Sequence, residues 1–161
     1  MRVARPLSEW WLLAAAALAQ LTVVVALRAT SLAATRGGLR HVRPAARLLV
    51  RGSDAAIVWA IEAVGRRFGR LSTCLTRALA GELLLDHASG APVTLTIGVR
   101  RTESGVLEAH AWLARSDRVL LGGTSDLYVP LANWPGLSRA SASESRGLSR
   151  ASARESRGPV T

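Results

Sequence analysis

The chain has 161 residues, 49% of them hydrophobic and 4% aromatic, which is the size of one domain with a mainly aliphatic core. Its formal charge of +10 is carried by 21 basic residues, all of which are arginine. The arginines are spread over the chain and form no basic stripe interleaved with aromatic residues, so no nucleic-acid partner is expected.

An apolar segment runs from Trp10 to Leu27 and is interrupted only by Gln20 and Thr22. Its length is at the threshold for a membrane span. The small residues that begin at Ser31 also fit the end of a signal peptide. A third interpretation is a helix that packs on the domain or rests on a membrane surface. We favour the third, because the alanine-rich centre is less apolar than most spans. The protein is then cytoplasmic, and any membrane association goes through this segment.

Helical patterns follow the apolar segment. Pro44 suits a first helical turn, and Asp54 is a good cap for a second helical segment that continues to Phe68. Within that segment apolar residues recur at helical spacing, at Ile57, Ile61 and Val64. This stripe should lie against the core.

Cys74 is the single cysteine, so it can form neither an internal disulfide nor a thiolate metal site. We predict no metal or other cofactor. After a break at Gly69, Ser72 or Thr73 can cap a helix whose first turn contains Cys74. The positive end of the helix dipole and the unpaired N–H groups there stabilise a thiolate, and the same N–H groups can stabilise an oxyanion. The position alone fits a nucleophile and a buried structural cysteine equally well.

From Pro92 onward the pattern changes to strands. Residues 93–101 and 106–114 alternate between apolar and polar, and shorter apolar runs follow at 118–122 and 127–131. Ser116-Asp117 is a reasonable two-residue turn. Helices followed by an antiparallel meander predict an α+β domain, in which N-terminal helices, with the cysteine at a helix N-terminus, pack on a small antiparallel sheet.

His110 lies on the polar face of the second expected strand, together with Glu108 and Trp112. The other face of that strand is apolar and should face the core. The helix that begins near Cys74 could then cover His110 and Trp112, so that a Cys/His pair forms. His41 and His87 have no such setting and are expected to be ordinary loop or helix-end histidines.

Three motifs carry a family resemblance: CLTRALA at 74–80, LTIGV at 95–99 and AHAWL at 109–113. In this order and spacing they resemble the lasso peptide leader peptidases, members of the transglutaminase-like branch of papain-type folds. The resemblance covers about residues 50–131. It implies that Cys74 is the nucleophile and that His110 is the base and later the acid.

The resemblance also implies the partners. These are a ribosomally made precursor peptide, a separate small protein that binds its leader, and a separate asparagine-synthetase-like cyclase that closes the macrolactam after cleavage. Family members often carry an aspartate close to the histidine. With the turn at Ser116-Asp117, the residue that faces His110 is Gly123, which cannot supply a carboxylate. Asp126 is therefore the candidate third residue, and Asp117 is a turn residue. The alternative is a Cys/His dyad in which a backbone carbonyl or water holds His110.

The sequence divides into an apolar helix with its connector at 1–42, a peptidase core at 43–135, and a tail at 136–161. The tail repeats an 11-residue unit, GLSRASASESR and then GLSRASARESR, and its composition predicts disorder. Two other functions stay open. One is a non-catalytic, basic, membrane-associated binding protein, and the other is a transglutaminase-like acyl transferase.

Overall fold

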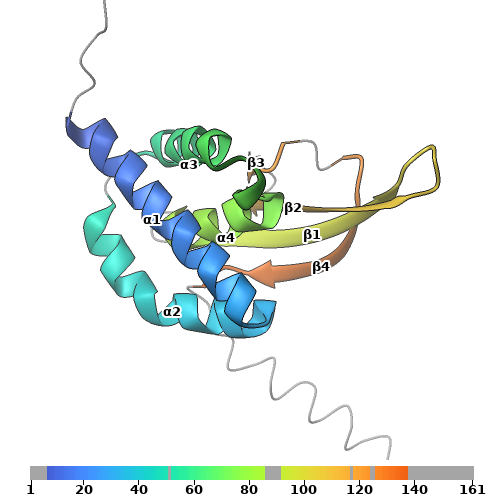
Figure 1. Ribbon diagram of the computed structural model, residues 1–161, viewed down its shortest axis with the longest axis horizontal. Coiled ribbons are helices and arrows are strands. Elements are labelled where there is room, and N and C mark those ends of the chain that lie inside the picture. Colours follow the sequence, from blue (N-terminus) through green and yellow to red (C-terminus); the bar gives the residue numbers. More distant parts are fainter. Residues whose placement is uncertain (1–6, 51, 86–91, 117, 124–125, 138–161) are drawn as a thin grey trace, which may run out of the picture.

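The computed structural model describes residues 7–50, 52–85, 92–116, 118–123 and 126–137, and everything below concerns these residues. The helices are α1 (Leu7–Ala29), α2 (Leu32–Leu49), α3 (Asp54–Phe68) and α4 (Cys74–Leu85), with a 3-10 turn at Gly69–Leu71. The strands are β1 (Val93–Arg101), β2 (Leu107–Arg115), β3 (Arg118–Leu121) and β4 (Val129–Pro135). Figure 1 shows the helices gathered beside the sheet, with α4 between α1 and the strands. The predicted α+β class is confirmed.

The helix ends follow the capping residues. Ser53, rather than Asp54, caps α3, because its hydroxyl accepts from the N–H of Ala56 at 3.3 Å. Asp54 is the first helical residue, and its carboxylate binds the Arg115 side chain. Gly69, with a φ of 53°, ends α3. Pro44 is not in a first turn but inside α2. The helix continues through it because Leu39 before it and Val50 after it are both buried in the core.

The sheet is antiparallel, with the strand order β3-β2-β1-β4. Arg115 pairs with Arg118, which confirms a two-residue connection between β2 and β3. The predicted meander is wrong at its last step, because β4 pairs with β1 instead of β3. β4 also begins two residues later than expected. Its pairing sets Trp134 beside Leu95, so that Trp134 joins the apolar face of the sheet.

The hydrophobic core lies between the helices and one face of the sheet. α1 contributes its inner side, at Leu12, Ala16, Ala19 and Val23, and packs on α3 and α4. This confirms the expectation that α1 packs on the domain. By length and composition, residues 9–29 are also apolar enough to cross a membrane, and one third of that stretch is buried.

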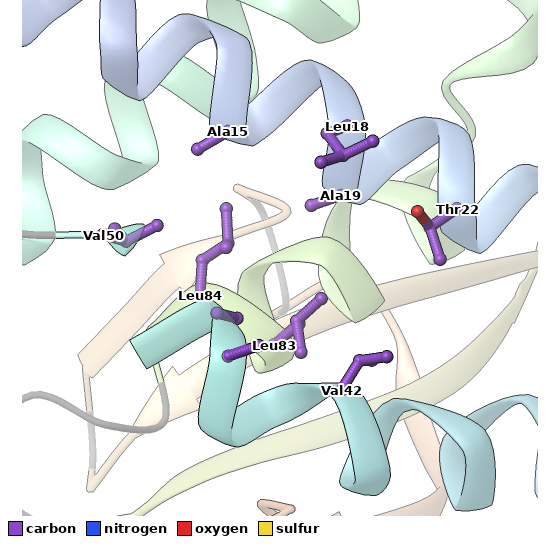
Figure 2. A pocket seen from close by; sticks show the side chains of 10 residues that line it. Ala15, Leu18, Ala19, Thr22, Val42, Val50, Leu83 and Leu84 are labelled. Atoms are coloured by element: carbon purple, nitrogen blue, oxygen red, sulfur yellow. The ribbon is translucent and has the colours of Figure 1, made fainter. Parts of the chain in front are cut away.

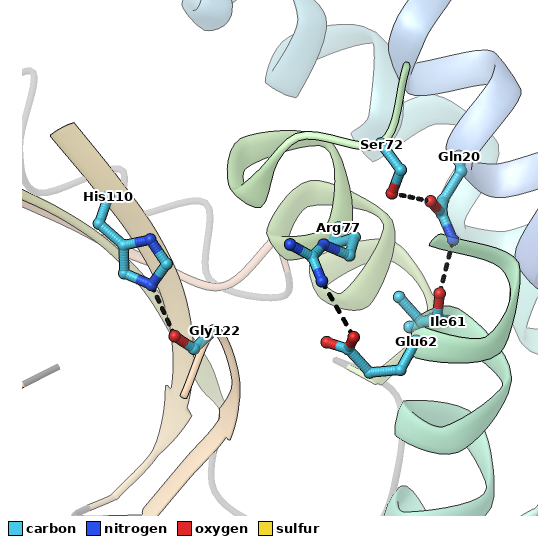
Figure 3. Close-up of polar contacts among 7 residues, drawn as sticks. All are labelled: Gln20, Ile61, Glu62, Ser72, Arg77, His110 and Gly122. Atoms are coloured by element: carbon cyan, nitrogen blue, oxygen red, sulfur yellow. Dashed lines mark hydrogen bonds and ion pairs between the residues drawn. The ribbon is translucent and has the colours of Figure 1, made fainter. Parts of the chain in front are cut away.

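Gln20 is fully buried in α1 and joins three parts of the fold (Figure 3). Its side-chain N–H donates to the Ile61 carbonyl of α3 at 2.9 Å. Its side-chain oxygen accepts from the Ser72 hydroxyl at 2.6 Å. Ser72 lies two residues before Cys74, so this polar interruption of the apolar helix fixes the loop that leads into α4.

We expect Gln20→Leu to lower the free energy of unfolding by about 2 kcal/mol, because the Ser72 hydroxyl would stay buried without its acceptor and the Ile61 carbonyl would lose the donor that it has besides its helical one. Thr22→Leu is the matched control, since Thr22 is an exposed polar residue of the same helix and its change should cost about 0.5 kcal/mol or less. Urea unfolding followed by circular dichroism measures both. Equal stability of the two variants would contradict the role assigned to Gln20.

A buried ion pair joins α2 to α4 and β4. The Arg36 guanidinium binds both carboxylate oxygens of Glu82 and donates to the Pro135 carbonyl at 2.9 Å. It also lies 5.7 Å from the centre of the Trp134 ring. Glu82 is 0% exposed, so water does not reach its carboxylate, and the Arg36 guanidinium compensates the buried negative charge. Leu137, the second residue of the repeat region, is also buried, and the rest of that region lies outside the described residues.

Candidate active site

Cys74 is the first residue of α4 and is half-buried against the core. Of the two predicted caps, Thr73 is the one used, because its hydroxyl accepts from the N–H of Thr76 at 3.2 Å. The Ser72 hydroxyl is instead turned to Gln20. Cys74 thus lies at the helix end where unpaired N–H groups and the positive end of the dipole meet. The described residues contain no cluster of side chains that could hold a metal ion.

α4 is held against α3 by a second contact. Arg77, in the first turn of α4, donates to Glu62 of α3 at 3.0 Å (Figure 3). Its side chain lies across Gly65, where an added Cβ would be 2.9 Å from the Arg77 Cδ. Glycine at this position therefore lets the two helices approach closely enough for the ion pair to form.

His110 is held by a backbone carbonyl. Its Nε2 lies 2.6 Å from the Gly122 oxygen (Figure 3). A carbonyl can only accept, so Nε2 carries the proton and donates. In the neutral ring the lone pair is then on Nδ1, which is the nitrogen left to take a proton from a nucleophile.

Gly122 can make this contact only because it is glycine. Its φ is 99°, in the region that favours glycine, and an added Cβ would lie 2.7 Å from the Cβ of Trp112. Any side chain at this position would push the carbonyl away from His110.

Aromatic rings enclose the His110 ring on the same side of the sheet. Tyr128, just before β4, stacks on it with 4.9 Å between ring centres, and Trp112 lies at 6.2 Å. The Arg100 guanidinium lies 5.1 Å from the centre of the Tyr128 ring and pairs with Glu108. The hydrogen bond that Arg100 donates to the Glu108 carboxylate raises the pKa of Arg100. Tyr128 was not predicted as a site residue. The sequence offers one signal for it, namely that it is the single tyrosine in the chain.

The expected pairing of His110 with Gly123 is wrong. Arg115 pairs with Arg118 as predicted, but the register then shifts between Leu113 and Ala114, and β3 ends at Leu121. A β-bulge of this kind moves every later residue by one position. β3 ends at Leu121, so no residue of β3 pairs with His110. Gly122, which follows the strand directly, contacts the ring through its carbonyl.

Asp126 lies exposed in the segment between β3 and β4. One ring nitrogen of His110, Nε2, is already bound to the Gly122 carbonyl. This contact does not test Asp126 as the third catalytic residue, so that assignment stays a prediction. Asp117 and His87 lie outside the described residues.

The helix that carries Cys74 covers the opposite face of the sheet from the one we expected. An added Cβ on Gly81 of α4 would clash with Leu121 and lie 3.1 Å from Leu113, so α4 packs on the apolar face. His110 shares the other face with Trp112. The apolar face attracts α4 because both surfaces there are buried aliphatic side chains. No hydrogen bond joins the Cys74 sulfur to the His110 ring within the described part of the chain.

α4 and β2 nevertheless run in the same direction. Gly81 lies against Leu113, and further along both elements Arg115 donates to the Leu85 carbonyl at 2.6 Å. Going back seven residues from Gly81 to Cys74 covers about 10 Å of helix, and going back three residues from Leu113 to His110 covers about 10 Å of strand. Cys74 and His110 therefore lie at the same end of the helix and sheet layers.

Comparison with known proteins gives one finding. The family model described as transglutaminase-like superfamily matches residues 17–133, which includes α2, α3 and α4, the sheet to within two residues of its end, and the second half of α1. No curated protein and no solved structure matches the chain significantly. Since the match covers most of the sequence, the chain belongs to the transglutaminase-like superfamily.

Proposed function

We propose that the protein is a cysteine peptidase that removes the leader from a ribosomally made lasso peptide precursor before the macrolactam is closed. The observation that carries this proposal is the His110 contact with Gly122, which leaves Nδ1 as the proton acceptor at the Cys74 end of α4. Membership of a superfamily that includes cysteine peptidases and acyl transferases supports the same chemistry. The three sequence motifs at 74–80, 95–99 and 109–113 supply the narrower assignment.

The proposed reaction uses the two residues in turn. Cys74 and His110 first come within hydrogen-bonding distance at the end of the two layers that they share, and His110 Nδ1 then takes the proton of Cys74. The thiolate attacks the carbonyl carbon at the end of the leader. N–H groups of the first turn of α4 stabilise the resulting oxyanion. The protonated ring then gives its proton to the leaving amine, which becomes the new N-terminus of the core peptide. Water, activated by the same ring, hydrolyses the thioester and releases the leader.

The proposed partners follow from this reaction. The precursor peptide is the substrate, a separate leader-recognition protein presents it, and an asparagine-synthetase-like cyclase consumes the core peptide. The test is to incubate the protein with a precursor and its leader-binding protein and to measure product masses. A peptidase gives two fragments whose masses sum to that of the precursor plus one water. An acyl transferase instead joins the acyl fragment to an added amine, and a purely binding protein leaves the precursor unchanged.

We expect Asp126→Asn to retain turnover within about threefold, because the Gly122 carbonyl already fixes the tautomer that a triad carboxylate would otherwise fix. Single-turnover cleavage, followed by mass spectrometry, measures the effect. Asp117→Asn serves as the control for loss of an acidic side chain near the same strands. A drop of about a hundredfold or more in Asp126→Asn alone would instead assign Asp126 as the third catalytic residue.

A further inference from the structure

The outer side of α1 carries a continuous apolar stripe. Its six large side chains are between 52% and 88% exposed. Five of them, together with the exposed Ala14, recur every three or four residues, and Trp10 adjoins Trp11. The six are Leu7, Trp10, Trp11, Leu18, Leu21 and Val25, and we call them the outer stripe. From its first to its last residue the outer stripe extends over about 27 Å of helix. An exposed apolar surface of this length marks an interaction site.

The inner side of α1 excludes a membrane span in this fold. Ala16, Ala19 and Val23 are at most 4% exposed, and Gln20 is hydrogen-bonded to two other parts of the core. Surrounding α1 with lipid would pull this side away from α3 and α4 and would leave the Gln20 side chain unpaired in hydrocarbon. Any contact of α1 with a bilayer must therefore be made by the outer stripe alone, with the helix lying along the surface.

Charge around the outer stripe matches an anionic surface. Between Leu7 and Leu49 the sequence contains one acidic residue, Glu9, and five arginines, at positions 28, 36, 40, 43 and 47. Arg28 is exposed at the C-terminal end of α1, and Arg40 is exposed on α2. Cationic side chains beside an apolar helix face are attracted to anionic headgroups. The tryptophan pair at the other end of the outer stripe suits the same headgroup level.

An apolar cavity continues the outer stripe between α1 and α2 (Figure 2). Its volume is about 220 Å³, and its walls include Leu18, Val42 and Leu84. Thr22 is the one residue with a hydrogen-bonding side chain among those that line it. A protein interface normally makes about one hydrogen bond per 100–200 Å². Acyl chains need none, so the chemistry of this surface favours lipid over a protein partner.

We propose that the protein docks on anionic lipid bilayers through the outer stripe, with α1 lying in the plane of the interface and the exposed Arg28 and Arg40 at the phosphate level. This proposal does not depend on the proposed peptidase activity.

The test uses the full chain and vesicles of phosphatidylcholine, with or without an equal part of phosphatidylglycerol. We expect the protein to float with the anionic vesicles, to bind the neutral ones far more weakly, and to be released by high salt or alkaline carbonate. Replacing Leu21 and Val25 together by glutamine should weaken binding at least about tenfold. The matched control replaces Val106 and Leu107, which are similarly exposed on the β1–β2 hairpin, and should bind as the wild type does.

Several results would overturn the proposal. Failure of the wild type to bind anionic vesicles is one, and binding by the Leu21/Val25 variant that equals binding by its control is another. Resistance to carbonate would mean that α1 spans the bilayer. A concentration-dependent dimer that the Leu21/Val25 change abolishes, without vesicle binding by the wild type, would assign the outer stripe to a second copy of the chain. The comparison of the two vesicle types with wild-type protein decides the question even if a variant does not fold.

Discussion

Cys74→Ala should abolish precursor cleavage, with a loss of at least about a thousandfold, while the protein keeps its fold. The change removes the sulfur that attacks the leader carbonyl, and no other thiol in the chain can replace it. Little packing is lost, because Cys74 is only half-buried at a helix end. Mass spectrometry of the precursor after incubation with the variant measures the effect, and thermal unfolding checks the fold.

His110→Ala should have an effect of the same order, since the base and the nucleophile act as a unit. His41→Ala is the matched control, because His41 is exposed on α2. Leader release by Cys74→Ala at near wild-type rate would remove Cys74 from the active site. It would leave the binding-protein alternative as the better interpretation of the chain.

Glu82→Leu should lower the free energy of unfolding by about 3–5 kcal/mol, the largest stability effect expected for a single substitution here. The change removes the carboxylate to which Nε and Nη2 of Arg36 donate, and Arg36 itself is only 6% exposed. A buried cation would remain, held by the Pro135 carbonyl and the Trp134 ring. Chemical denaturation of purified protein measures the loss.

Glu62→Leu is the control for this change. Glu62 also pairs with an arginine, Arg77, but both side chains are about one third exposed, so water replaces most of what is lost. The expected cost is about 1 kcal/mol or less. A similar cost for the two variants would mean that the Arg36–Glu82 pair is not sealed from solvent in solution.

Local chemistry explains what the sequence predicted well. The bounds of β1 agree with the alternating pattern at 93–101, because Val93 and Leu95 anchor one face of that strand in the core. Gly69 ends α3, and a cap places Cys74 in the first turn of α4, because both depend on residues next to the helix ends.

Long-range packing explains what the sequence could not predict. An alternating pattern predicts that β2 has two faces, but it does not indicate which helix covers which face. The prediction that α4 covers the His110 face was therefore wrong. The bulge next to Leu113 and the end of β3 at Leu121 have no sequence signal of their own, and they remove the expected pairing of His110 with Gly123. The pairing of β4 with β1 depends on contacts of Trp134 that are remote in sequence. The sequence indicated that Gly122 is conformationally free, but a backbone carbonyl contact to His110 was only one of the alternatives that it left open.

The contact between His110 and the Gly122 carbonyl has a consequence for how the protein tolerates mutation. A carboxylate that orients a histidine can be lost by changing one side chain, and its conservative amide replacement leaves the backbone in place. A carbonyl cannot be lost in that way, so the orientation of His110 can be disturbed only by moving the main chain. All nineteen replacements of Gly122 do this, because each adds a Cβ against Trp112 at a φ that only glycine adopts easily. Sensitivity to substitution is thereby transferred from an acidic residue to a glycine that carries no reactive group.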